Sequence, residues 1–175
     1  MGYWPYKKLF EECRHNDCDI YVETGTYKGD SVQDALDLGF KVVISVEKNK
    51  TFYQECFKRF NGLDIWGYRP TQDPNLYLFH GDSSELMPNL LEKVNGKALF
   101  WLDAHENGEV IPTINEIDYI LKDKRNDHTI IIDDMDLVEY SISLNDLKSK
   151  FLEKNSDYKF KNMKVSTAQQ LIIYT

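Results

Sequence analysis

Apolar residues along the chain follow two alternating patterns. Short and almost continuous apolar runs, such as residues 41–46 and 129–132, are typical of strands that are buried on both faces. Longer stretches between such runs place apolar residues at helical spacing, as in residues 113–122, and predict amphipathic helices. The alternation predicts an α/β fold in which helices cover both faces of a mostly parallel sheet.

The same pattern indicates where each element lies. The expected strands are residues 19–23, 41–46, 76–80, 98–103, 129–132, 158–165 and 169–174. The expected helices are residues 6–13, 30–38, 49–60, 83–94, 113–122 and 144–152. The last two strands are separated by a short turn, so we expect them to be antiparallel neighbours. The sequence thus predicts a seven-stranded, mostly parallel sheet that finishes in an antiparallel hairpin.

Acidic residues stand at the ends of the expected strands. Ligands of open parallel sheets bind beyond the carboxyl ends of the strands, so acids at these positions should line one crevice. The acids are Glu23, Glu47, Asp82, Asp103 and the pair Asp133 and Asp134.

Length, charge and cysteine content narrow the class of protein. The 175 residues fit one domain, with an N-terminal helical segment at 1–18 and a core at 19–175. The formal net charge of −8 argues against a broad electrostatic footprint on nucleic acid or anionic lipid. No run approaches the roughly 18 apolar residues of a membrane span, and three cysteines, an odd number, suit a reducing compartment. We expect a cytoplasmic protein that binds neither nucleic acid nor membrane.

Residues 21–30, YVETGTYKGD, combine a strand end, a glycine-containing turn and a helix start. Gly25 allows the backbone to approach a ligand closely, and Gly29 permits a tight entry into the helix. The turn is not the dinucleotide fingerprint G-x-G-x-x-G, which favours an uncharged nucleoside over a pyrophosphate. Glu47 ends the next strand, where an acid suits hydrogen bonding to the hydroxyls of a ribose.

On these residues the chain resembles class I S-adenosylmethionine-dependent methyltransferases over residues 19–175. The resemblance lies in the turn 23–29, in the strand ends 44–47 and 100–103, in residues 81–83 and in the terminal hairpin. It implies a Rossmann-like fold and S-adenosylmethionine (SAM) as the cofactor. Thr26 departs from the family, because many members carry a second glycine of the turn there.

The resemblance also assigns roles within the cofactor site. It implies that Glu23 and Gly25 face the methionine part, that Glu47 holds the ribose, and that Asp82 with Ser83 meets the adenine. The candidate cofactor-binding residues are Glu23, Thr24, Gly25, Thr26, Gly29, Glu47, Lys48, Asp82, Ser83 and Asp103.

A second group of polar residues, Asp103, His105, Asp133 and Asp134, follows two other strands. Hard cations such as Mg²⁺ prefer oxygen ligands, so the three carboxylates are candidate metal ligands. A cation lowers the pKa of a bound acceptor hydroxyl, and His105 could then remove the proton of that hydroxyl. His105 and Asp103 are therefore the candidate catalytic residues. The alternative is that the acid pair caps a helix and His105 is an exposed loop residue.

The positions of the candidate metal ligands and of the candidate base resemble those in metal-dependent O-methyltransferases. These enzymes act on sugars of natural products, as macrocin O-methyltransferase does, or on catechol-like phenols. The implied function is SAM-dependent transfer of a methyl group to a hydroxyl of a small molecule, a sugar or glycoside, assisted by Mg²⁺. Two alternatives stay open: a metal-independent methyltransferase acting on a protein or nucleic-acid group, and a non-catalytic cofactor-binding partner subunit. A homodimer and a domain of a larger polypeptide are also both open.

Overall fold

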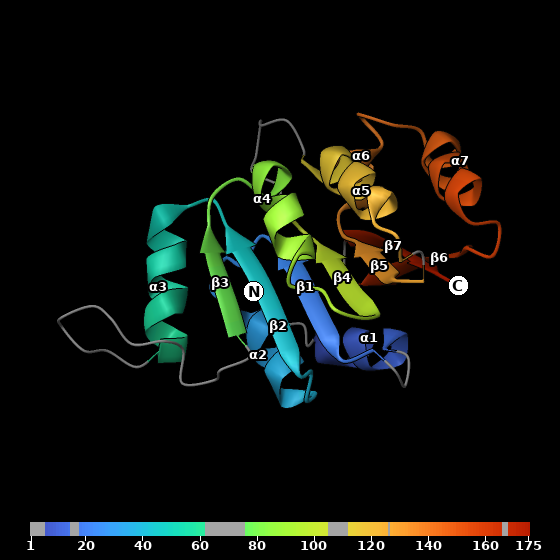
Figure 1. Cartoon of the computed structure of the whole chain (residues 1–175). Helices are drawn as coiled ribbons and strands as arrows, with labels where there is room; N and C mark the ends of the chain where they lie inside the picture. The colour runs from blue at the N-terminus through green and yellow to red at the C-terminus, as the bar shows by residue number, and fades with distance from the viewer. Residues whose placement is uncertain (1–5, 15–17, 62–75, 105–111, 126, 166–167) are drawn as a thin grey trace.

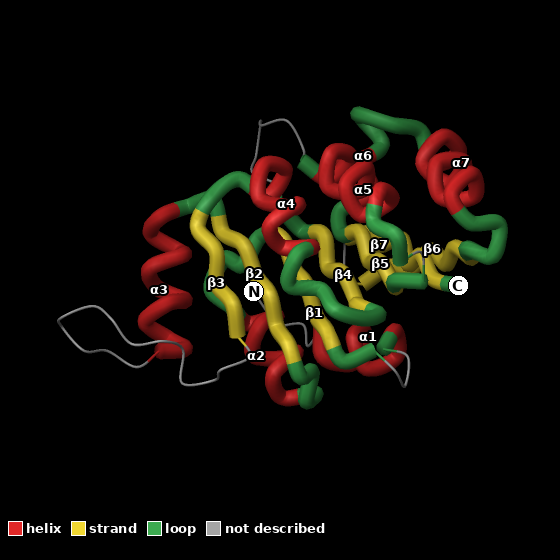
Figure 2. Tube along the Cα trace, in the orientation of Figure 1, coloured by secondary structure: helices red, strands yellow, loops and turns green. Residues whose placement is uncertain are grey.

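A seven-stranded sheet with helices on both faces makes up the computed structural model, which describes residues 6–14, 18–61, 76–104, 112–125, 127–165 and 168–175 (Figures 1 and 2). The strands are β1 Ile20–Thr24, β2 Val42–Glu47, β3 Leu76–His80, β4 Ala98–Leu102, β5 Thr129–Ile132, β6 Lys159–Val165 and β7 Ala168–Tyr174. The helices are α1 Tyr6–Cys13, α2 Asp30–Asp37, α3 Lys50–Asn61, α4 Ser83–Leu91, α5 Thr113–Lys122, α6 Met135–Val138 and α7 Leu144–Lys154.

The strands lie in the order β3-β2-β1-β4-β5-β7-β6. Neighbours are parallel from β3 to β5, whereas β7 is antiparallel to both β5 and β6. The predicted fold class, including the terminal antiparallel hairpin, is therefore confirmed. The chain winds outward from β1 toward β3 and then returns to β4 on the other side of β1, so the order reverses between β1 and β4. Sheets of this kind bind ligands at that reversal.

Alternate residues of each central strand pack against different helical layers. Val22 of β1 belongs to a core cluster with residues of α4, α5 and α7. Its neighbour Tyr21 belongs to a second cluster that contains Phe10 of α1 and Val32 of α2. In Figure 1 the two layers lie above and below the sheet. Both faces of the central strands are thus buried, which explains their nearly continuous apolar sequences.

Observed and expected elements differ mainly at their ends. Helix α5 begins and ends at the expected residues, whereas α4 ends before residue 94. Strand β1 extends to Thr24, so Glu23 lies inside the strand rather than after it. Helix α6 was not expected, because four residues are too few to reveal helical periodicity. Its Met135 and Val138 are nevertheless buried one turn apart.

Two expectations from composition are also answered by the described residues. Among them, no helix is both long enough and apolar enough to cross a membrane. Cys13, Cys18 and Cys56 form no disulfide with one another, as their odd number and the rest of the composition predict.

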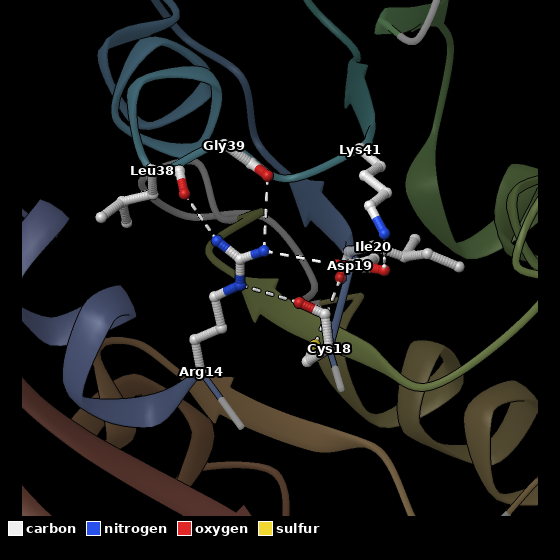
Figure 3. A network of polar contacts seen from close by, with 7 residues as sticks. All are labelled: Arg14, Cys18, Asp19, Ile20, Leu38, Gly39 and Lys41. Carbon is white, nitrogen blue, oxygen red and sulfur yellow. Dashed lines mark hydrogen bonds and ion pairs between the residues drawn. The ribbon is translucent and has the colours of Figure 1, made fainter. Parts of the chain in front are cut away.

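Arg14, directly after α1, joins three segments near the amino-terminal ends of the central strands (Figure 3). Its guanidinium donates to the carbonyl oxygens of Cys18 at 2.8 Å, Leu38 at 2.6 Å and Gly39 at 3.3 Å. The guanidinium also lies over the Phe40 ring, 4.2 Å from its centroid. The last two carbonyls follow α2, where cations are favoured by the helix dipole. Arg14 therefore fixes the C-terminal end of α1 to the start of β1 and the end of α2.

We expect Arg14→Ala to lower the free energy of unfolding by about 2 kcal/mol, because several carbonyl oxygens lose a charged donor. Urea denaturation measures the change. Lys8→Ala is the matched control on the same helix, since the Lys8 side chain is 81% exposed; its effect should stay below about 0.5 kcal/mol. Equal effects of the two substitutions would contradict this role of Arg14.

Candidate functional site

Backbone hydrogen bonds continue past the ends of the parallel strands and tie the following loops together. Each bond joins a residue at or beyond one strand end to a residue at the end of a neighbouring strand. The acids expected at one edge of the sheet are therefore brought together along that edge. The N–H···O bonds are Gly25 to Val46 (3.0 Å), Gly81 to Glu47 (3.0 Å), Asp103 to Thr24 (3.1 Å) and Asp133 to Leu102 (3.0 Å).

Gly25 lies where the loops after β1 and β4 touch. Its φ of +88° is in the left-handed region, and a β-carbon there would meet the Asp103 carbonyl group, 2.8 Å from the carbonyl carbon. Gly29, with φ +78°, precedes α2, and a β-carbon there would be 2.7 Å from the Phe60 ring. Both expected glycine positions of the turn are therefore required by backbone conformation and by space.

Thr26 replaces a family glycine and belongs to a buried polar network beneath the turn. Its hydroxyl makes a short hydrogen bond with the Ser45 hydroxyl. Ser45 donates in turn to Oε1 of Glu23 at 2.7 Å, and the Tyr21 hydroxyl donates to Oε2 at 2.9 Å. A glycine could not join this network, so the departure from the family has a local structural reason.

Glu23 is fully buried within that network. Burial raises the pKa of its carboxyl to about 7, although hydrogen bonds from Ser31, Ser45 and Tyr21 act in the opposite direction. Its carboxylate is thus engaged by protein donors from the helix α2 side of the sheet. Direct contact of Glu23 with the methionine part of a cofactor stays a prediction.

Glu47, at the tip of β2, holds the backbone of two loops. Its Oε2 accepts from the N–H of Tyr27 at 2.7 Å, and its Oε1 accepts from the N–H of Asn49 at 2.7 Å. A carboxylate has about four acceptor positions, so two bonds leave capacity for ligand hydroxyls. The Glu47 side chain therefore lies where a ribose-binding acid is expected, although its role is untested.

The start of α4 brings the remaining cofactor candidates to the same edge. Asp82 caps the helix by accepting from the N–H of Ser84 at 3.0 Å. Lys48 reaches across from β2, with its Nζ 3.5 Å from Oδ2 of Asp82. Hydrogen bonding from Ser84 keeps the pKa of Asp82 below its ordinary value, with burial acting against it. Ser83 is buried in the first turn of α4.

Asp103, Asp133 and Asp134 form the acidic part of the edge after β4 and β5. Burial raises the pKa of Asp103 well above its ordinary value, and the charges of Asp133 and Asp134 raise it further. Oδ1 of Asp133 accepts from Gln170 at 2.6 Å and from the N–H of Asp134 at 2.9 Å. Asp134, with φ +44°, precedes α6, but among the described residues its side chain makes no capping hydrogen bond. The capping alternative is thus not supported for Asp134.

The metal assignment stays a prediction. Within the described part of the chain, no group of three or more His, Cys, Asp or Glu side chains is arranged to hold a metal ion. His105 lies outside the described residues, as do most of the long loops at 61–75 and 104–112. The charges of Asp133 and Asp134 do act on Asp103, and such repulsion is what a divalent cation would relieve.

Two residues at this edge were not singled out from the sequence. The Tyr6 ring of α1 lies 4.9 Å from the Trp101 ring. Burial, followed by the charges of Asp133, Asp103 and Asp134, raises the pKa of Tyr6. The helical spacing of residues 6–13 predicts the helix but does not indicate which loop the start of the helix contacts, so Tyr6 could not be assigned to this edge from the sequence. The second residue, Glu116 of α5, is fully buried. It lies one turn before the apolar Ile120 and so on the same face of the helix, and this spacing in the sequence could have indicated that Glu116 is buried.

No protein-family model matches the sequence, and no curated protein matches it. Solved structures do match. The O-methyltransferase TomG from Streptomyces achromogenes, solved with SAM, has a TM-score of 0.68 and 16% identity, over 100% of this chain and 82% of that chain. An O-methyltransferase from Bacillus cereus in complex with S-adenosylhomocysteine (SAH) has a TM-score of 0.65 and 11% identity, over 97% and 78%. An rRNA methylase from Streptococcus thermophilus has a TM-score of 0.62 and 14% identity, over 100% and 98%.

These similarities span nearly the whole chain at low sequence identity, so what they establish is the fold. The chain has the Rossmann-like fold of the class I SAM-dependent methyltransferases. In sheets of this kind the strand-order reversal is a ligand site, and here that position holds Gly25 and Asp103.

We expect Gly25→Ala to destabilise the protein more than Gly39→Ala does. Both glycines have positive φ, but a β-carbon at Gly39 meets nothing within 4 Å, whereas one at Gly25 meets the Asp103 backbone. The backbone conformation alone should cost each variant about 1 kcal/mol, and the clash should add about 2 kcal/mol for Gly25→Ala. Urea denaturation of both variants gives the difference, and equal losses would show that the loops are not in tight contact.

Proposed function

We propose that this protein is a SAM-dependent O-methyltransferase that transfers a methyl group to a hydroxyl of a small molecule, a sugar or glycoside. The observation that carries the proposal is the row of acids at the carboxyl ends of the parallel strands, with Glu47 ending β2, Asp82 after β3 and Asp103 after β4, where backbone hydrogen bonds join the neighbouring loops. The fold adds support, because TomG and the Bacillus cereus protein are both O-methyltransferases, solved with SAM and with SAH.

In this proposal the cofactor lies across the ends of β1, β2 and β4. The Gly25 turn receives its methionine part, Glu47 accepts hydrogen bonds from the ribose hydroxyls, and Asp82 with Ser83 meets the adenine. Lys48 lies beside Asp82 and completes this end of the site. The turn and Glu47 are held in place before ligand binds, since Glu47 already accepts from the N–H of Tyr27. Such preorganisation lowers the entropic cost of binding.

The reaction would be a single in-line displacement. The acceptor oxygen attacks the sulfonium methyl, the carbon–oxygen bond forms, and the sulfur leaves with the electrons of the broken carbon–sulfur bond as SAH. Aligning the two reactants supplies most of the rate enhancement. Asp103 and His105 are the proposed residues for orienting the acceptor hydroxyl and removing its proton.

We also propose that Mg²⁺ assists at Asp103, Asp133 and Asp134. The charges of the last two act on Asp103, and carboxylate oxygens are the ligands that this cation prefers. Bound there, the cation would supply a lower pKa of the acceptor hydroxyl. Asp133 would contribute mainly Oδ2, because its Oδ1 already accepts two hydrogen bonds.

A second candidate function is methylation of a nucleic-acid group without a metal. The rRNA methylase from Streptococcus thermophilus favours it, since the match covers 98% of that chain. The net charge of −8 counts against it, because nucleic acid binding depends strongly on cationic surface. We therefore place a small-molecule acceptor first.

Calorimetric titration with SAH tests the cofactor site. We expect saturable binding, and we expect Glu47→Ala to weaken it by about tenfold or more, because a charged acceptor of ribose hydroxyls is lost. Glu55→Ala is the control, since Glu55 is an exposed acid on the neighbouring helix α3. Unchanged affinity in Glu47→Ala would refute the ribose assignment, and no binding by the unsubstituted protein would refute the proposed function.

Turnover tests the acceptor side. In a screen of sugars and glycosides that measures SAH release, Asp103→Asn should lower kcat by about a hundredfold or more, because the base and its charge are lost. Its affinity for SAH should change little, since the cofactor is held mainly by other residues. Chelator should stop turnover and added Mg²⁺ should restore it. Turnover that is unchanged by chelator would instead favour the metal-independent alternative.

A further inference from the structure

Glu116 is a buried acid that the mechanism above does not use. It lies in the first turn of α5, facing the apolar layer rather than solvent, with none of its surface exposed. In the described part of the chain, neither of its carboxyl oxygens has a hydrogen-bond partner of ordinary geometry. A buried polar group left in this state is costly, so its presence needs a reason.

The neighbours of Glu116 are two candidate cofactor residues. The hydroxyl groups of Ser83 and Thr24 lie near its carboxyl and act to lower its pKa, but neither makes a hydrogen bond with it. Thr24 is the last residue of β1, directly before Gly25, and Ser83 is the first residue of α4, directly after the capping Asp82. Both hydroxyl residues are themselves buried. Three buried polar side chains from three elements thus meet directly beneath the candidate cofactor site.

The environment of Glu116 favours its neutral form. Burial raises the pKa of Glu116 to about 7, the hydroxyls of Ser83 and Thr24 act to lower it, and the charge of Asp82 raises it further. Asp82 is the one charged group among the described residues whose field acts on it. A neutral carboxyl both donates and accepts, whereas a carboxylate only accepts. An ionised Glu116 would also be a buried charge on which no cation of the described segments acts.

We propose that Glu116 is a positioning residue of the cofactor site, whose buried carboxyl lies between Thr24 and Ser83 and so sets the spacing between the end of β1 and the start of α4. The inference rests on the proposed function, because Thr24 and Ser83 matter to a ligand only if the cofactor binds there. Ionisation of Glu116 would draw water into this layer and loosen the two elements. Cofactor binding, which excludes water from the edge, would then become weaker.

The test compares the affinity for SAH of the unsubstituted protein with that of Glu116→Gln across pH. SAH serves as the probe because it lacks the sulfonium charge of SAM. The glutamine mimics the neutral acid but cannot ionise, so the two proteins should bind equally near about pH 5.5. Near about pH 8.5 the unsubstituted protein should bind about fivefold or more weakly than Glu116→Gln. Other groups that titrate in this range are common to both proteins and cancel in the ratio.

Asp118→Asn is the matched control, because Asp118 is on the same helix but forms an ion pair with Lys150, and its side chain is 40% exposed. Its affinity ratio to the unsubstituted protein should not change with pH. A ratio that stays flat for Glu116→Gln, or a loss of affinity equal at every pH, would overturn the positioning role. If the unsubstituted protein binds no SAH at any pH, the proposed function fails and the assignment of Glu116 to a cofactor site fails with it.

Denaturation by urea gives a readout that needs no ligand. The folded-state pKa of about 7 lies above the ordinary value of 4.5. The stability that the neutral acid contributes is therefore fully present below about pH 4.5 and is lost as pH rises to about 7. The urea midpoint of the unsubstituted protein should fall over this window more steeply than that of Glu116→Gln. Parallel curves would show that folding does not raise the pKa of Glu116, and would also overturn the inference.

Discussion

The close contact between the loop after β1 and the loop after β4 is the constraint on which the site depends. Gly25 leaves room for the Asp103 carbonyl, and the N–H of Asp103 donates back to Thr24. The ends of β1 and β4 are therefore held together at the point where the strand order reverses. Without that contact, the turn that would receive the cofactor and the acid that would meet the acceptor would not share one edge.

Beneath that edge several carboxyl groups are buried. Glu23 and Glu116 are fully buried on opposite faces of the sheet, and burial raises the pKa of each to about 7. Burial, followed by the charges of neighbouring acids, raises the pKa of Asp103. Raised pKa values of this kind concentrate at functional sites, because a fold stabilised only by packing has no need for them.

Much of the fold could be predicted from the sequence because its signals are local. The continuous apolar run at β2 and the helical spacing at α5 each carry enough information to identify the element. The edge acids also followed from the sequence, because an acid at a strand end has only one edge to occupy in a parallel sheet. By contrast, α6 is too short to show a period. The buried state of Glu23 depends on Tyr21 and Ser45 from two strands, and pairings of that kind are not visible along one chain.

Tyr6 shows the same difficulty for a long-range contact. Its position on a helix could be predicted, but its approach to Trp101 depends on how α1 crosses the sheet. Similarly, Thr26 departs from the family in sequence, yet its hydroxyl has a definite partner in Ser45. The residues that sequence reasoning missed are thus those whose role is set by a contact between separate elements.

The attachment of α1 has a consequence for how the site could change. Arg14 fixes the helix at one end, and Tyr6 stands at the other, beside the ring of Trp101 and within the field of the edge acids. Tyr6 is therefore at the start of a helix whose C-terminal end is fixed by Arg14 near the amino-terminal ends of the strands. Under the proposed function, a different side chain at position 6 would alter what an acceptor meets while the strands and their loops stay as they are. New acceptor preference would then arise from a helix that contributes nothing to the Gly25 turn.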